Sequence, residues 1–269
     1  MTKIVRNLMH PGLLTCRADA TLGEVATMLT QHHVHSILVA DRSGRPLGIL
    51  SDYDVLAGEW LSGDPESMAA MRKLTASDLM SHPIDSVEAS LPLNEAARIL
   101  NEKDRNRLLV TENGKAVGVI SISDFVASIA REEKHTIGLV SDVMSDAILV
   151  CRDKTPITSA ARTMTEARWR SVLVVNEAGK PEGVVSGKDL MRFVEKGVDL
   201  KLTVHDVMHK ALTINFNASL REAADIMIQT HHHRLVVLDE KNPEAFPLGI
   251  ISSFDIVGAM ARQGSIWQS

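Results

Sequence analysis

The stretch Gly249-Ile250-Ile251-Ser252-Ser253-Phe254-Asp255 has three counterparts earlier in the chain, Gly48 to Asp54, Gly118 to Asp124 and Gly183 to Asp189. Each copy consists of Gly, two aliphatic residues, Ser, two variable positions and Asp. The aliphatic pair predicts a buried strand, and the Ser predicts a helix start, because Ser caps free backbone N–H groups there and Asp three residues later completes a capping box. A helix start also attracts anions. The stretch is therefore either a cap or one side of a phosphate or ribose site.

The composition indicates a globular protein. Of 269 residues, 45% are hydrophobic and 23% are charged, which disfavours disorder. The net charge of -5 disfavours nucleic-acid binding, which usually needs a basic face. No apolar run approaches the roughly 18 residues of a membrane span, and Met1 to Met9 lacks the apolar segment of a secretory signal. Cys16 and Cys151 lack CxxC spacing, so we expect a reduced, cytoplasmic protein.

Each copy of the stretch closes a repeat that opens with a short segment ending in Met. The openings are Asn7-Leu8-Met9, Asp78-Leu79-Met80, Asp142-Val143-Met144 and Asp206-Val207-Met208. Apolar periodicity predicts a strand, a helix, a hairpin and a closing helix in each repeat. The predicted first strands are Leu13 to Arg17, Ile84 to Val87, Ile148 to Arg152 and Ala211 to Phe216. The predicted helix starts are Thr21, Ser90, Thr155 and Ser219.

The predicted fold is α/β (α+β), with four β-α-β-β-α repeats. One repeat is too small to bury a good core alone, so we expect the repeats to pair. The expected modules are residues 1–135, with repeats at about 1–62 and 74–135, and residues 136–269, with repeats at about 137–199 and 200–269. We expect Gly58 to Lys73 to form an extended connector and Arg131 to Thr136 to form the joint between modules.

This set of motifs resembles the cystathionine-beta-synthase (CBS) domain family, with four copies in two Bateman modules. The Asp-x-Met opening, the Thr-x-x-x-x-Ala helix entry and Gly-h-h-Ser-x-x-Asp carry the resemblance, where h is an aliphatic residue. The stretch from His233 to Asp239 closely resembles the nucleotide-sensing gamma subunit of AMP-activated protein kinase. The resemblance implies that the two modules close into a flat, pseudo-symmetric disk within one chain. A homodimer is the competing arrangement.

The resemblance also assigns roles to four aligned columns. It implies that the motif aspartates accept the two ribose hydroxyls; these are Asp54, Asp124, Asp189 and Asp255. The motif serines are assigned to phosphate: Ser51, Ser121, Ser186 and Ser252. A basic column before the middle strand is also assigned to phosphate, together with two neighbouring cations: His35, Arg105, Arg170 and His233, with Arg234 and Lys188. The adenine pocket is assigned to Thr15, Ser86, Val150 and Thr213.

The repeats differ in how completely they match these columns. Val150 interrupts the adenine column in repeat 3, and Asp52 in repeat 1 would repel phosphate, so repeats 2 and 4 look the most complete. The histidine runs around His33 and His232 raise the alternative of a metal site, because histidine is a common ligand. They lack HExxH and paired cysteines. We therefore expect no metal and regard them as histidines at helix C-termini, which the helix dipole favours.

The expected function is regulatory. The chain would bind AMP, ADP or ATP, the last with Mg²⁺, between CBS repeats, and an unidentified regulated protein would detect the resulting change in module arrangement. No nucleophile stands beside a base, so we expect no enzyme activity. Two alternatives remain open: an interaction module whose motifs are only helix caps, and a sensor of S-adenosylmethionine or a dinucleotide. Cys16 and Cys151 are expected to be small core residues.

Overall fold

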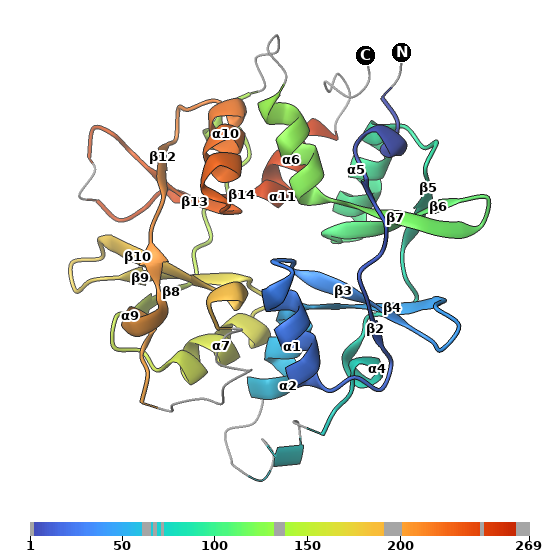
Figure 1. Ribbon diagram of the computed structural model, residues 1–269. Coiled ribbons are helices and arrows are strands. Elements are labelled where there is room, and N and C mark those ends of the chain that lie inside the picture. Colours follow the sequence, from blue (N-terminus) through green and yellow to red (C-terminus); the bar gives the residue numbers. More distant parts are fainter. Residues whose placement is uncertain are drawn as a thin grey trace. The chain divides into compact units, whose positions relative to one another are not determined.

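The computed structural model describes residues 3–60, 66, 69–70, 73–131, 138–190, 201–242 and 245–261 (Figure 1). The chain divides into two compact units that interleave along the sequence. Unit 1 comprises Met1–Leu13, Asp85–Ile148 and Leu212–Ser269, and unit 2 comprises Leu14–Ile84 and Leu149–Ala211. Unit 1 therefore holds the sheets of repeats 2 and 4, and unit 2 holds those of repeats 1 and 3.

Unit 2 contains two β-α-β-β repeats with their flanking helices. Repeat 1 has β2 (Thr15–Arg17), α1 (Leu22–Gln31), β3 (Ser36–Ala40), β4 (Pro46–Ser51) and α2 (Asp52–Trp60). Repeat 3 has β8 (Val150–Arg152), α7 (Ile157–Glu166), β9 (Ser171–Val175) and β10 (Pro181–Ser186), and its closing helix is described over 187–190. The short elements α4 (Ala76–Leu79), α9 (Val204–Val207) and β11 (His209–Lys210) complete this unit.

Unit 1 has the same construction. Repeat 2 has β5 (Ser86–Glu88), α5 (Leu93–Glu102), β6 (Arg107–Glu112), β7 (Lys115–Ser121) and α6 (Ile122–Ala130). Repeat 4 has β12 (Thr213–Asn215), α10 (Leu220–Thr230), β13 (Arg234–Leu238), β14 (Gly249–Ser252) and α11 (Ser253–Met260). The short elements are η1 (Val5–Asn7), β1 (His10–Pro11) and η2 (Val140–Asp142).

In all four repeats the first strand is parallel to the middle strand, and the middle strand is antiparallel to the third. A helix connects the parallel pair, as that pairing requires. The predicted α/β class and the order of elements are thus confirmed. The first strands are shorter than predicted; β2, for example, begins at Thr15.

Two repeats share each hydrophobic core. In unit 1, α6 packs against α10 and α11, and in unit 2, α2 packs against α7 (Figure 1). Alanine pairs, such as Ala96 and Ala97 on α5, are fully buried at these faces. Repeats 2 and 4 therefore share one core, and repeats 1 and 3 share the other. The expected modules 1–135 and 136–269 join repeats of different units, so their pairing stays a prediction. The proposed boundary near residue 136 falls outside the described residues.

Helix starts agree with the sequence in two repeats and differ in two. Thr21 and Ser219 cap α1 and α10, as predicted, and their side chains accept hydrogen bonds from the N–H groups of Glu24 and Glu222. The predicted starts at Ser90 and Thr155 are wrong, because the N-caps are the prolines that precede Leu93 and Ile157. Proline has a fixed φ that suits this extended position.

The connector was also placed too early in the sequence. The helix α2 continues to Trp60, so Gly58 is helical and the connector predicted from Gly58 onwards begins later. Most of the remaining connector lies outside the described residues.

The opening segment of each repeat lies on the hairpin of another repeat. The strand β1, from repeat 1, pairs with β7 of repeat 2, and Ser81, from repeat 2, bridges Ile49 of repeat 1. Repeats 3 and 4 exchange their segments in the same way. There β11 pairs with β10, and Ser145 bridges Ile250. No local sequence pattern predicts this exchange.

The exchanged segments explain the glycine that begins each motif. A Cβ atom on Gly118 would lie 2.3 Å from the carbonyl oxygen of His10, and one on Gly249 would lie 2.3 Å from that of Ser145. Only a residue without a side chain permits this approach of one backbone to another.

Candidate functional site

The capping box is present in all four motifs. In each repeat the backbone N–H and the Oγ of the motif serine both donate to Oδ2 of the motif aspartate. The N–H distances are 2.8, 2.7, 2.8 and 2.7 Å, and the Oγ distances are 2.6, 2.8, 2.6 and 2.6 Å, for repeats 1 to 4. Capping therefore uses one carboxylate oxygen, Oδ2, and makes no hydrogen bond to Oδ1.

Histidines from the exchanged segments contact two of the four carboxylates. Nδ1 of His10 lies 2.8 Å from Oδ1 of Asp124, and Nδ1 of His209 lies 3.2 Å from Oδ2 of Asp189. The carboxylates of Asp54 and Asp255 accept hydrogen bonds only from their own motif serines within the part of the chain that the structure describes. At Asp54 and Asp255, Oδ1 thus has no hydrogen-bond donor among the described residues, and Asp255 also lines a cavity.

The two motif aspartates of unit 2 have pKa values shifted in opposite directions. Burial raises the pKa of Asp54, although hydrogen bonds from Ser51 and the charge of Arg170 oppose the shift. Burial acts in the same direction on Asp189, but hydrogen bonds from His209 and Ser186 outweigh it and lower the pKa of that carboxyl. The histidine contact therefore favours the ionised form of Asp189.

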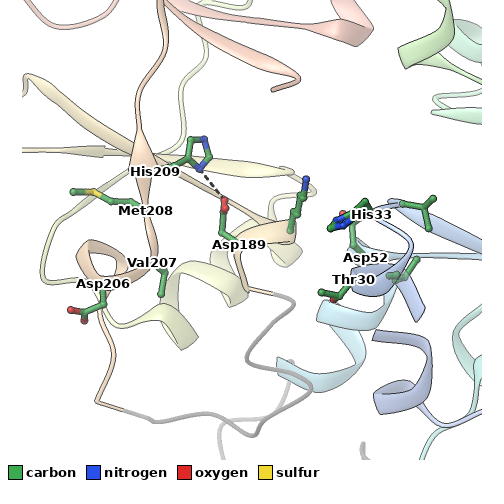
Figure 2. Close-up of a pocket in the computed structure, with 11 residues that line it drawn as sticks. Thr30, His33, Asp52, Asp189, Asp206, Val207, Met208 and His209 are labelled. Carbon is green, nitrogen blue, oxygen red and sulfur yellow. Dashed lines mark ion pairs between the residues drawn. The ribbon is translucent and has the colours of Figure 1, made fainter. Parts of the chain in front are cut away.

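A cavity of about 530 Å³ adjoins Asp189 in unit 2 (Figure 2). Lys188 and Asp189 come from the start of the third closing helix, and His209 comes from the exchanged segment of repeat 4. His33 and Asp52 line it from the end of α1 and the start of α2. This volume lies within the range of sites that hold small organic molecules.

A second cavity of about 530 Å³ adjoins Asp255 in unit 1. Phe254 and Asp255 come from α11, Met144 comes from the exchanged segment of repeat 3, and Arg98 and Asn101 come from α5. Both cavities thus combine a motif aspartate, an exchanged segment and a helix of the other repeat in the same unit.

The residues predicted to bind phosphate have partners within the protein. Nδ1 of His35 lies 2.9 Å from Oδ2 of Asp52. Asp52 is therefore the partner of this histidine, in addition to being a negative charge that would repel phosphate. The guanidinium carbon of Arg170 lies 5.9 Å from the centre of the Tyr53 ring. Nδ1 of His233 lies 3.3 Å from Oγ of Ser253. Lys188 is exposed at the first cavity.

The basic column is misaligned in repeat 2. The hairpin turn there is Asn113-Gly114, with positive φ at both residues, whereas the corresponding turns of repeats 1 and 3 hold one residue more. Strand pairing sets Arg107 opposite Ser121, as Ser36 is opposite Ser51. The counterpart of His35 is therefore Asn106, and Arg105 lies one residue too early. Its Nε donates to Asp85 at 2.8 Å.

The corrected alignment identifies a residue that the sequence analysis missed. Arg107 and Arg234 occupy the same position, each opposite its motif serine. An alignment that counts residues back from the motif serine does not show this equivalence, because the hairpin turn of repeat 2 is one residue shorter.

The column assigned to the adenine pocket is structurally consistent. Its members begin the first strands and are exposed, and each lies opposite an aliphatic residue of the middle strand; they are Thr15, Ser86, Val150 and Thr213. None of them lines either cavity. Their role toward a base stays a prediction.

The histidine runs occupy helix C-termini. His32 is the C-cap of α1, and His231 is the left-handed C-cap of α10, as the sequence predicted. Among the described residues, no group of three or more His, Cys, Asp or Glu side chains is arranged to hold a metal ion. Burial raises the pKa of Cys16 and Cys151 to about 11, so both thiols stay protonated and unreactive near neutral pH.

The histidines that contact the motif carboxylates were also missed. They belong to a column that directly follows the opening Met of each repeat: His10, Ser81, Ser145 and His209. The signal was visible in the sequence, but only the exchange of segments places this column beside a motif of another repeat.

In the described part of the chain, no helix has both the length and the apolarity required to cross a bilayer.

Comparison with known proteins identifies the family. The CBS domain matches residues 5–58, 76–131, 140–196 and 204–262. The uncharacterized protein MJ1404 of Methanocaldococcus jannaschii is 28% identical over 195 residues, which cover 71% of this chain and 44% of that protein. The uncharacterized protein MK0525 of Methanopyrus kandleri is 25% identical over 134 residues, which cover 49% of this chain and 63% of that protein. The chain thus spans less than two thirds of these relatives.

A solved structure supports the fold. The crystal structure of MJ1225 from Methanocaldococcus jannaschii, described as a putative archaeal homolog of g-AMPK, matches 95% of this chain and 99% of its own with a TM-score of 0.83. Its sequence identity of 16% means that the likeness concerns the fold alone. Together with the four matched domains, these findings show that the chain belongs to the CBS domain family.

Proposed function

We propose that this protein is a regulatory sensor that binds adenine nucleotides through its motif aspartates. The observation that carries the proposal is that capping uses only one of the two oxygens of a motif carboxylate. The cap occupies Oδ2, and at Asp54 and Asp255 no donor from the described chain reaches Oδ1. A ribose diol can supply the missing donors, since a carboxylate accepts several hydrogen bonds. Asp255 and Asp189 each adjoin a cavity of about 530 Å³.

The charges of the linings favour AMP over ADP or ATP. Among the described residues, the first cavity has three carboxylates, from Asp52, Asp189 and Asp206, and one permanent cation, Lys188. The second also has three carboxylates against one cation, Arg98. Each additional phosphate adds negative charge to an already acidic lining, so ATP should need Mg²⁺ to reduce its charge.

The exchanged segments suggest how binding is transmitted. Met208 and His209 line one cavity and Met144 lines the other, and the segments that hold them join repeats 3 and 4 by backbone pairing. A ligand that contacts them changes the relative free energies of repeat arrangements by its differential affinity for each. We propose on this ground that repeats 1 and 2, and repeats 3 and 4, act as two modules, and that a protein partner detects their arrangement. Closure into a single-chain disk and further dimerisation are both compatible with this proposal.

A second candidate function is supported by the caps themselves. Because all four Ser-x-x-Asp motifs form capping boxes, the chain can serve as an interaction module that binds no nucleotide. Thermal-shift and calorimetric titration of the purified protein with AMP, ADP, ATP, NAD and S-adenosylmethionine separates the candidates. We expect AMP to raise the melting temperature through binding to the folded state. No response to any of the five compounds would favour the interaction module.

A further inference from the structure

One position has the same backbone location in all four repeats, but it holds histidine in two of them and serine in the other two. The residue after the opening Met lies opposite the residue after the motif Gly in all four repeats. These pairs are His10 with Val119, Ser81 with Ile49, Ser145 with Ile250, and His209 with Val184. We call His10, Ser81, Ser145 and His209 the selector position. Each unit has one histidine selector and one serine selector.

A histidine at the selector position contacts the motif carboxylate, whereas a serine there does not within the described residues. His10 contacts Oδ1 of Asp124, whose side chain is 6% exposed, while Ser121 donates to Oδ2. Both oxygens of Asp124 are therefore engaged. At Asp189, His209 and Ser186 converge on Oδ2. At the serine positions, Asp54 and Asp255 make no such contact within the described chain.

We propose that the selector position determines which motif carboxylates accept a ribose diol. This inference rests on the proposed function and divides its four sites into two classes. The carboxylates of Asp54 and Asp255 bind the diol directly. A ligand at Asp124 must displace histidine, because neither oxygen is left, and a ligand at Asp189 meets a carboxylate that already shares its charge with His209 through Oδ2.

Exchanging the selector residues tests the proposal, because each class already contains the replacement residue. We expect wild-type protein to bind AMP tightly at two sites, the serine class. His209→Ser should raise the affinity of the Asp189 site roughly fivefold, the effect of losing one partly exposed ion pair. Ser81→His should remove one tight site. His205→Ser is the matched control, because His205 is exposed and lines neither cavity.

Calorimetry with AMP and with 2′,3′-dideoxy-AMP supplies a measurement that a purely structural effect would not change. The gain from His209→Ser should appear with AMP and vanish with the dideoxy compound, which lacks the hydroxyls that compete with histidine. If wild type binds AMP but both selector variants retain wild-type affinity and stoichiometry, the selector role is overturned and the proposed function stands.

A second measurement observes His209 directly. In histidine-labelled protein, the imidazole NMR signals of His209 should move when Asp189 is changed to Asn, and AMP should move them in the same direction in wild type. If AMP binds without moving them, His209 is not displaced and the selector role is overturned. If AMP binds to no variant, the proposed function fails, even when the Asp189→Asn shift is present.

Discussion

Ser252 donates both its backbone N–H and its Oγ to Asp255, at 2.7 and 2.6 Å, and both hydrogen bonds end on Oδ2. The sequence presents capping and ligand binding as alternatives for this pair. The geometry makes them compatible, because one oxygen completes the cap while the other faces no donor from the described chain. A cap of this kind also fixes the carboxylate before a ligand arrives, which reduces the entropy lost on binding.

We predict opposite effects on stability from Asp54→Asn and Asp189→Asn. The pKa of Asp54 is raised, so its ionised form is unfavourable in the folded protein, and Asp54→Asn should be more stable than wild type at pH 7. The pKa of Asp189 is lowered, so Asp189→Asn should be less stable, by about 1 kcal/mol for the lost contact with His209.

Urea unfolding at several pH values checks these signs. The contribution of Asp189 should be present above the ordinary pKa of aspartate, about 3.9, and should be lost as the pH falls through its lower folded value. The gain of Asp54→Asn should be absent below about pH 3.9 and should grow as the pH rises through the raised pKa of Asp54. Shifts of the same sign in both variants would contradict the role of His209.

We predict that the motif glycines tolerate no side chain where segments are exchanged. Gly249→Ala should lower the free energy of unfolding by about 2 kcal/mol, because its Cβ would lie 2.3 Å from the carbonyl oxygen of Ser145. The control is Gly23→Ala on α1, where nothing lies within 4 Å of the new Cβ. There alanine should stabilise by roughly 0.5–1 kcal/mol, since glycine is a poor helix former. Equal effects in the two variants would show that the exchanged segment does not pack as described.

We predict that nucleotide affinity rises from pH 8 to pH 6 at the site served by His233. Histidine in model peptides titrates near pH 6.5, and only its charged form attracts phosphate strongly. His233 contacts Oγ of Ser253, and it belongs to the basic column assigned to phosphate. His233→Ala should therefore lose most of the pH dependence at its site. Calorimetry at three pH values measures this difference, and identical affinities throughout would exclude charged histidine from binding.

The repeat pattern allowed most of the fold to be predicted. Gly-h-h-Ser-x-x-Asp marks the strand end, the helix start and the cap with local chemistry, and all four copies form as expected. The sequence was less informative where a choice depended on distant chain. The register of Arg105 differs from the prediction because the turn is one residue shorter, and the capping propensity of Ser90 predicts a helix start there, whereas the N-cap is Pro92.

Only part of the site could be predicted, because some of its contacts depend on segments that are distant in the chain. The motif carboxylates and Lys188 depend on local sequence, and Lys188 and two of the carboxylates line cavities. The contacts of His10 and His209 arise only after segments exchange between repeats. No local pattern encodes that exchange, although the Met that precedes each selector marks the segment that pairs with another repeat.

Calorimetric titration of AMP into wild type, Asp255→Ala and Glu24→Ala tests the central claim most directly. Both variants remove the acid of a capping box, but Glu24 caps α1 away from either cavity. Asp255→Ala should cost about 1 kcal/mol of stability, and Glu24→Ala should also lower the melting temperature. The account predicts that Asp255→Ala alone loses one binding site, because its hydrogen bonds to the ribose are worth on the order of 1.5–3 kcal/mol each. Unchanged AMP affinity and stoichiometry in Asp255→Ala, with a lowered melting temperature, would contradict it and leave the motif as a helix cap.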